Sequence, residues 1–238
     1  MNRVIAIIKK ELSSYFNSPI AYIFISVFLV ISSWIFFRNF FLIGQVTTDN
    51  YFYLLPWIFL FIIPATTMRL WAEEKKNGTM EILLTWPVSA KELVLGKFFA
   101  SLIFIIITLL ISISLPISLS FVGNLDWGIV IVSYLGAILL AAALLAIGLF
   151  ISSLSENQII AFIAGVALSF VLFIIGENII LFSLPNFWAA VFSHLGLGQH
   201  FASISRGVID SRDIIYYLSI IIFFLFLNTQ RIRSERWK

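Results

Sequence analysis

The chain has 238 residues, of which 61% are hydrophobic and only 11% are charged, and it carries a formal net charge of +3 with no cysteine. Its mean hydropathy of +1.05 lies well above the usual range and excludes an ordinary soluble globule. The lack of cysteine excludes disulfides, thiolate metal sites and cysteine nucleophiles. Several apolar runs of about 18 residues or more are long enough to cross a bilayer as helices. The composition therefore predicts an all-α polytopic membrane protein with a single transmembrane domain over residues 1–238.

The first expected element is an amphipathic helix over residues 2–16. Val4, Ile8, Leu12 and Tyr15 fall on one face of this helix, while charged and polar side chains fall on the other. A helix with this pattern lies along a membrane interface rather than across the bilayer. We therefore expect residues 2–16 to lie at the inner surface of the membrane.

Six membrane-spanning helices follow in the apolar pattern, near 20–38, 52–70, 97–121, 128–151, 158–176 and 214–229. Their orientation follows from the basic residues, because Lys and Arg accumulate on the inner side of a membrane. With both termini inside, 12 of the 15 basic residues are inner, and only Arg38, Arg206 and Arg212 are outer. The chain is thus predicted to lie in the cell inner membrane with both termini cytoplasmic. Its net positive charge then reflects topology and attraction to anionic membrane lipid, not a nucleic-acid partner.

The inner segment 70–96, between the second and third spans, holds the densest charge cluster of the chain, with five charged residues from Glu73 to Glu81. Topology requires the lysines of this cluster but not its acids. Gly78 can end a helix in a left-handed conformation, and Pro87 closes a second, apolar turn. The pattern predicts two short helices that dock a soluble partner, with charges for register and apolar anchors at Met80, Leu83, Leu84 and Trp86.

Two further segments stand outside the spans. The inner loop 152–157, SSLSEN, is short and holds one acid. The outer segment 177–213 is too polar to span a bilayer and too apolar for a simple loop. Apolar residues recur there at helical spacing on both sides of Gly196 and Gly198, which predicts two short interfacial or re-entrant helices at the outer headgroup level.

Small residues recur every four positions along the fifth span, at Ala161, Gly165 and Ser169, and they crowd the fourth span over 136–148. Small side chains let membrane helices approach closely. These faces serve either packing within one chain or a seam between two subunits, and the pattern by itself leaves both alternatives open.

A search for catalytic and cofactor motifs points away from an enzyme. Gly96 and Lys97 form the only Gly-Lys pair, and the rest of a phosphate-binding loop is missing around them. The two histidines, His194 and His200, are six residues apart and are expected to be interfacial side chains rather than metal ligands. No serine, histidine and acid group together at membrane depth. We expect no catalytic residue, cofactor or metal in this chain.

The stretch EEKKNGTMEILLTWPVSAKELVLGKF, residues 73–98, closely resembles the signature of ABC-2 type transporter permeases. Two further stretches, PWIFLFIIPATTMR (56–69) and SSLSENQIIAFI (152–163), are similar to the gliding-motility-associated, GldF-like branch of that superfamily. The resemblance covers most of the chain. It implies six spans, an inner coupling helix between spans 2 and 3, and outer helices between spans 5 and 6.

The resemblance also implies partners. Such permeases pair two membrane subunits with two separate ATPases, so the second membrane subunit here is another copy or a related auxiliary protein. ATP and magnesium are then bound by the ATPase and not by this chain. The residues that match the ATPase-coupling segments are Glu73, Glu74, Gly78, Thr79, Glu81, Leu84, Pro87, Glu156, Asn157 and Gln158.

The function implied is that of the non-catalytic membrane subunit of an ATP-driven exporter or mechanical complex. One alternative is a membrane scaffold that engages the same ATPase without passing a substrate. A second alternative is a membrane-embedded enzyme. Hydrolysis of ATP by a co-purified partner separates the enzyme from the other two, and flux of a defined substrate in vesicles separates the exporter from the scaffold.

Overall fold

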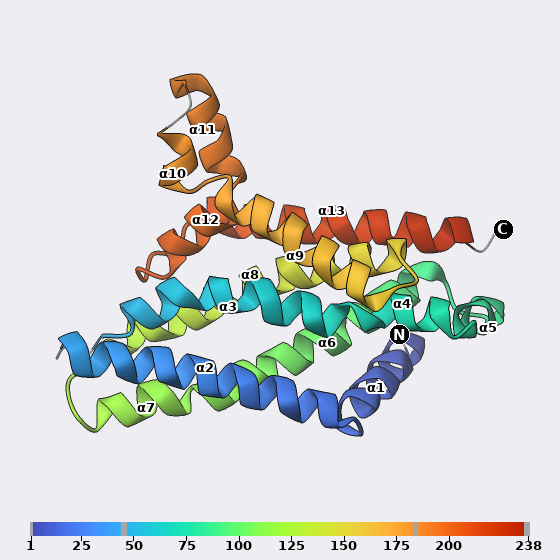
Figure 1. Cartoon of the computed structure of the whole chain (residues 1–238), viewed down its shortest axis with the longest axis horizontal. Helices are drawn as coiled ribbons and strands as arrows, with labels where there is room; N and C mark the ends of the chain where they lie inside the picture. Colours follow the sequence, from blue (N-terminus) through green and yellow to red (C-terminus); the bar gives the residue numbers. More distant parts are fainter. Residues whose placement is uncertain (1, 44–46, 183–184, 236–238) are drawn as a thin grey trace.

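The computed structural model describes residues 2–43, 47–182 and 185–235, and within these ranges all regular structure is helical (Figure 1). Long helices run side by side along the long axis of the molecule, and the two termini lie at the same end. In chain order the helices are α1 Asn2–Phe16, α2 Pro19–Ile43, α3 Asp49–Thr67, α4 Arg69–Lys76, α5 Thr79–Thr85, α6 Ala90–Ser112, α7 Ser114–Ser120, α8 Trp127–Leu154, α9 Gln158–Ile174, α10 Asn178–Leu181, α11 Asn186–Leu195, α12 Leu197–Ile204 and α13 Ser211–Glu235.

Five helical stretches within the described residues are long and apolar enough to cross a membrane: Pro19–Arg38, Asp49–Lys76, Ala90–Ser120, Trp127–Leu154 and Ser211–Glu235. The predicted fifth span is also helical, but α9 has only 17 residues. α8 is the centre of the bundle, since it contacts α3, α4, α6, α9, α12 and α13. The all-helical, multi-pass prediction is confirmed, whereas the sixth crossing stays a prediction.

The helix that contains the third predicted span begins before it, since α6 starts at Ala90, within the inner segment 70–96. Ser89 and Glu92 form a capping box there: the Ser89 hydroxyl accepts from the Glu92 amide, and the Glu92 carboxylate accepts from the Ser89 amide at 2.7 Å. This pairing satisfies amide groups that would otherwise be free at the helix start. The first turns of α6 thus precede residue 97, and the start of the third span near that residue stays a prediction.

The small-residue faces of α8 and α9 pack against other helices of the same chain. Ala161, Gly165 and Ser169 are all buried, and a Cβ added at Gly165 would lie 3.3 Å from the ring of Pro64 in α3. Gly148 of α8 approaches Thr67 more closely still, since a Cβ there would overlap the threonine hydroxyl. Of the two alternatives that the sequence left open, packing within one chain accounts for these faces.

The described residues of segment 177–213, which was predicted to lie on the outer side, form three short helices rather than two. α10 and α11 project sideways from the bundle, across the direction of the long helices (Figure 1), and Phe187 and Trp188 of α11 are 72% and 51% exposed. α12 instead packs against α8, α9 and α13, with Phe201 and Ile204 buried. Phe201 and Ile204 therefore serve the core, while the aromatic residues of α11 lie on the surface.

His200 joins two helices, a role that the sequence did not indicate, while its predicted place at the membrane interface stays a prediction. Its Nδ1 lies 2.6 Å from the carboxylate of Asp213 in the first turn of α13, and its Nε2 lies 3.1 Å from the carbonyl of His194. Its ring also stacks on Tyr216 with centroids 3.9 Å apart. His200 thus ties α12 to α13, a role that depends on a contact between residues 13 positions apart. His194 is exposed, and no group of three metal-ligating side chains occurs among the described residues.

Candidate functional site

The predicted docking segment lies at one end of the bundle, together with both termini (Figure 1). We call this region the charged end: it comprises α1, α4, α5, the α8–α9 connection 155–157 and the last turns of α13. α4 ends in Lys75 and Lys76, Gly78 adopts φ +68°, and α5 then begins at Thr79. The positive φ is the conformation that glycine reaches without strain. The two short helices and the glycine break between them are therefore present as predicted.

The start of α4 is held by a side chain from α8. The Ser152 hydroxyl accepts from the amides of Trp71 and Ala72 at 3.1 and 3.3 Å and donates to the carbonyl of Met68 at 2.9 Å. The first amides of a helix lack partners within it, so an oxygen placed there acts as a cap. The end of α8 thereby fixes the direction in which α4 leaves the bundle.

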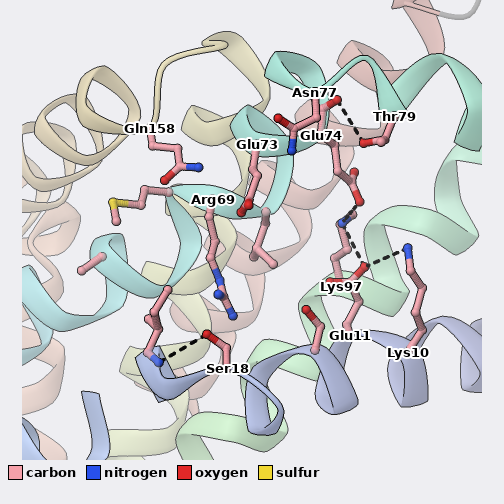
Figure 2. Close-up of a pocket in the computed structure, with 15 residues that line it drawn as sticks. Lys10, Glu11, Ser18, Arg69, Glu73, Glu74, Asn77, Thr79, Lys97 and Gln158 are labelled. Atoms are coloured by element: carbon pink, nitrogen blue, oxygen red, sulfur yellow. Dashed lines mark hydrogen bonds and ion pairs between the residues drawn. The ribbon is translucent and has the colours of Figure 1, made fainter. Parts of the chain in front are cut away.

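A buried ion-pair cluster joins α4 to α1 and α6. The ammonium of Lys97, whose side chain is 2% exposed, lies 2.7 Å from Glu74 and 3.1 Å from Glu11. It also lies 4.9 Å from the ring centroid of Trp71. Figure 2 shows the three charged side chains pointing toward one another from three helices. Since a lone charge in such surroundings is costly, these contacts bind α1, α4 and α6 into one unit.

α1 packs directly on this unit. A Cβ at Gly96 would lie 2.5 Å from Ile7, which shows how closely α1 approaches α6. Tyr15 is buried and donates its hydroxyl to the carbonyl of Thr66 at 3.3 Å, and the guanidinium of Arg69 lies over its ring. Burial raises the pKa of the Tyr15 phenol, so this residue stays neutral and keeps its donor.

A cavity of about 470 Å³ opens beside the cluster (Figure 2). Glu73 and Glu74 of α4 line it together with Thr79 of α5 and Gln158, the first residue of α9. The Thr79 hydroxyl donates to the carbonyl of Glu74 at 3.2 Å across the Gly78 break. Four residues predicted from two separate segments therefore meet around one cavity.

A second cavity, of about 590 Å³, lies between α5, the α8–α9 connection and α13. Gly78, Glu81 and Glu156 line it together with Arg231 and Glu235. Lys75 closes its wall, since its ammonium donates to the carbonyl of Ser153 at 2.7 Å and to Glu235 at 3.2 Å. The acids Glu81 and Glu156 are thus brought to one surface although they are 75 residues apart.

The remaining predicted residues have local roles. The Asn157 side chain accepts from the amide of Ile159 at 2.8 Å and caps α9, and Pro87 accepts through its carbonyl from Arg3 at 2.5 Å. The side chain of Leu84 lies outside the described part of the chain. Met80 is 5% exposed and packs in the core, so it is not available as an anchor for a partner.

Glu74 also differs from expectation. It was predicted to face a partner, but its carboxylate is turned inward onto Lys97. Reversal of Glu74 to lysine would therefore place a second ammonium beside Lys97 and disturb the fold, although the positive-inside rule alone would tolerate the added charge. Glu73 and Glu81 are exposed and remain the acids of this segment that a partner can reach.

Sequence reasoning missed Lys97, Glu11, Ser152 and Glu235. One signal was present for Lys97: a lysine near the start of an apolar helix is costly in lipid and needs a partner. No comparable signal identified which acid would pair with it, because Glu11 and Glu74 lie on other helices.

These features define a multi-pass helical membrane protein in which the short helices α1, α4 and α5 form a charged end of the bundle. A family model described as ABC-2 family transporter protein matches residues 5–205, and the chain therefore belongs to this family. Members are in general non-catalytic transmembrane subunits of ABC transporters and imply an ATP-binding partner. No curated protein matches the chain.

Proposed function

We propose that the chain is a permease subunit that couples ATP hydrolysis by separate ATPase subunits to export or mechanical work across the inner membrane. The observation that carries this proposal is the α4–Gly78–α5 pair in a chain of the ABC-2 family, placed beside the α8–α9 connection at the same end of the bundle. α5 offers apolar contacts, since Ile82 is 59% exposed. The neighbouring acids Glu81 and Glu156 supply charge for register.

The mechanism that fits this arrangement is mechanical. Closure of the ATPases on nucleotide would displace α4 and α5, and the contacts of Ser152 and Lys97 would carry that displacement into α8, α1 and α6. A rigid contact passes on a movement that a solvated loop would absorb. The permease itself does no covalent chemistry in this scheme.

The orientation of the chain in the membrane is part of the same proposal. The charged end faces the cytoplasm, α9 completes six spans, and α10–α12 lie on the outer side.

Two permease subunits, either two copies or one copy and an auxiliary protein, form a complex with two ATPases. Because the small-residue faces of α8 and α9 are buried within the chain, the seam would use other surfaces, such as the exposed apolar face of α2. Similarity to the gliding-motility branch suggests mechanical work as well as export.

Substitution of Gly78 tests the coupling role. No atom lies within 4 Å of a Cβ at this position, so the cost of a side chain is backbone strain alone, roughly 1–2 kcal/mol and more for a β-branched residue. We expect Gly78→Val to lower nucleotide-linked ATPase activity of the co-purified complex several-fold, with Gly78→Ala intermediate. Gly78→Asn is the matched control, since asparagine tolerates positive φ. Equal activity in the Val and Asn variants would contradict a role for the helix break.

The orientation is testable with single cysteines, because the native chain has none. Ala202→Cys in α12 and Asn77→Cys beside Gly78 are both at exposed positions. We expect an impermeant maleimide added to intact cells to label residue 202 and to label residue 77 only after the membrane is opened. Labelling of residue 77 in intact cells would reverse the proposed topology.

A further inference from the structure

A third cavity at the charged end has a different chemical character. It lies between the start of α6 and the last turns of α13, has a volume of about 370 Å³, and is lined by Lys91, Phe226, Thr229, Gln230 and Arg233 among others. Acids line both larger cavities at this end, but no acid lines this one. None of the ten residues matched to the ATPase-coupling segments lines it, although Lys91 lies within the inner segment 70–96.

The two cations of this cavity are free within the described part of the chain. Lys91 and Arg233 are exposed and make no hydrogen bond or ion pair there. Lys97 and Lys75, by contrast, are neutralised by glutamates. The acid next to Lys91 is Glu92, and its carboxylate is turned back onto Ser89 as part of the capping box. Two uncompensated cations therefore converge from helices 142 residues apart in sequence.

The wall of the cavity on α13 is continuous with an exposed apolar face of the same helix. Phe226, Thr229, Gln230 and Arg233 follow one another at helical spacing and share one face of α13. The same face is exposed and apolar further along the helix, at Ile215, Leu218 and Ile222. From Phe226 to Arg233 the helix rises by about 10 Å. The face therefore passes from apolar through neutral polar to cationic, which is the order of acyl chain, glycerol and phosphate in a phospholipid.

We propose that this cavity binds an anionic phospholipid through its phosphate. Lys91 and Arg233 contact the phosphate oxygens, Arg233 through its planar pair of donors. Gln230 donates to a glycerol or phosphate oxygen, and Phe226 contacts the first methylenes of an acyl chain. Basic pockets between helices at the membrane surface recognise lipid headgroups in this way. The exposed apolar face below the cations favours a lipid over a free phosphate ion.

Native mass spectrometry of the full chain tests the proposal. The protein is equilibrated in nanodiscs of equal parts phosphatidylglycerol and phosphatidylcholine, and the lipids that remain bound are counted. We expect the wild-type chain to retain phosphatidylglycerol selectively. Lys91→Gln/Arg233→Gln should lose about thirty-fold in this selectivity, which converts to about 2 kcal/mol. Both residues are exposed, so the fold and the melting temperature should be unchanged.

The matched control is Lys9→Gln/Lys76→Gln, which removes two exposed cations that line none of the three cavities. Retained selectivity in this control supports a built site. An equal loss in both double variants would show general surface attraction and overturn the proposal. Displacement of the bound lipid by millimolar inorganic phosphate, or by the purified ATPase, would assign the cavity to a soluble anion or to the protein interface and would overturn it as well.

Discussion

Replacement of Lys97 by methionine is expected to destabilise the chain by about 3–5 kcal/mol, the range for removing one partner from a buried ion pair. The reason is that Glu74 and Glu11 would keep their negative charges in a largely enclosed site, with side chains 15% and 12% exposed. One oxygen of Glu74 is already buried without a hydrogen-bond partner among the described residues. The measurement is the melting temperature in detergent, and melting is monitored as the fraction of protein that remains monodisperse after heating.

Two further variants distinguish the effect of breaking the ion pair from the effect of removing any lysine. Lys76→Met removes an exposed cation from α4 and should leave the melting temperature unchanged. Lys97→Met/Glu74→Gln neutralises one of the two stranded carboxylates and should recover more than half of the lost stability. If the double variant were as unstable as Lys97→Met, the packing of the lysine stem rather than its charge would be responsible.

Neutralisation of two of the three acids that line the second cavity, Glu81→Gln/Glu156→Gln, is expected to weaken ATPase recovery by about 100-fold or more. Charge-assisted contacts contribute about 1.5–3 kcal/mol each where they are desolvated, so the loss of two gives this factor. Insertion should be normal, because acids contribute little to topology. The measurement is a pull-down titration of the ATPase from membranes that contain equal amounts of permease.

Asp49→Asn/Asp210→Asn provides the matched control, because it removes two acids that lie outside the charged end. Asparagine keeps the side-chain oxygen that accepts from the Arg212 amide, so the start of α13 should be preserved. Recovery of the ATPase at wild-type levels by Glu81→Gln/Glu156→Gln would remove these acids from the docking surface. Reduced recovery in the control as well would point to a general effect of net charge.

The sequence alone determined the class of protein and the order of its helices. Apolar runs and their lengths predicted the long helices, since each depends on composition within one stretch of chain. The helix break at Gly78 was also predictable, because glycine before a new apolar turn is a local signal. The motif over residues 73–98 pointed to the ABC-2 family, which the family match over residues 5–205 supports.

Only the tertiary structure decided which charges are buried and which remain at the surface. Glu73 and Glu74 are adjacent and alike in sequence, yet Glu74 pairs with Lys97 while Glu73 is exposed. Glu81 and Glu156 meet at one cavity because α4 is held against the end of α8 by Ser152. The contacts of His200 and Lys97 were likewise visible only in the structure, because their partners lie on other helices. The energy of a charged side chain depends on what surrounds it in three dimensions, and helix packing brings those groups together from distant parts of the chain.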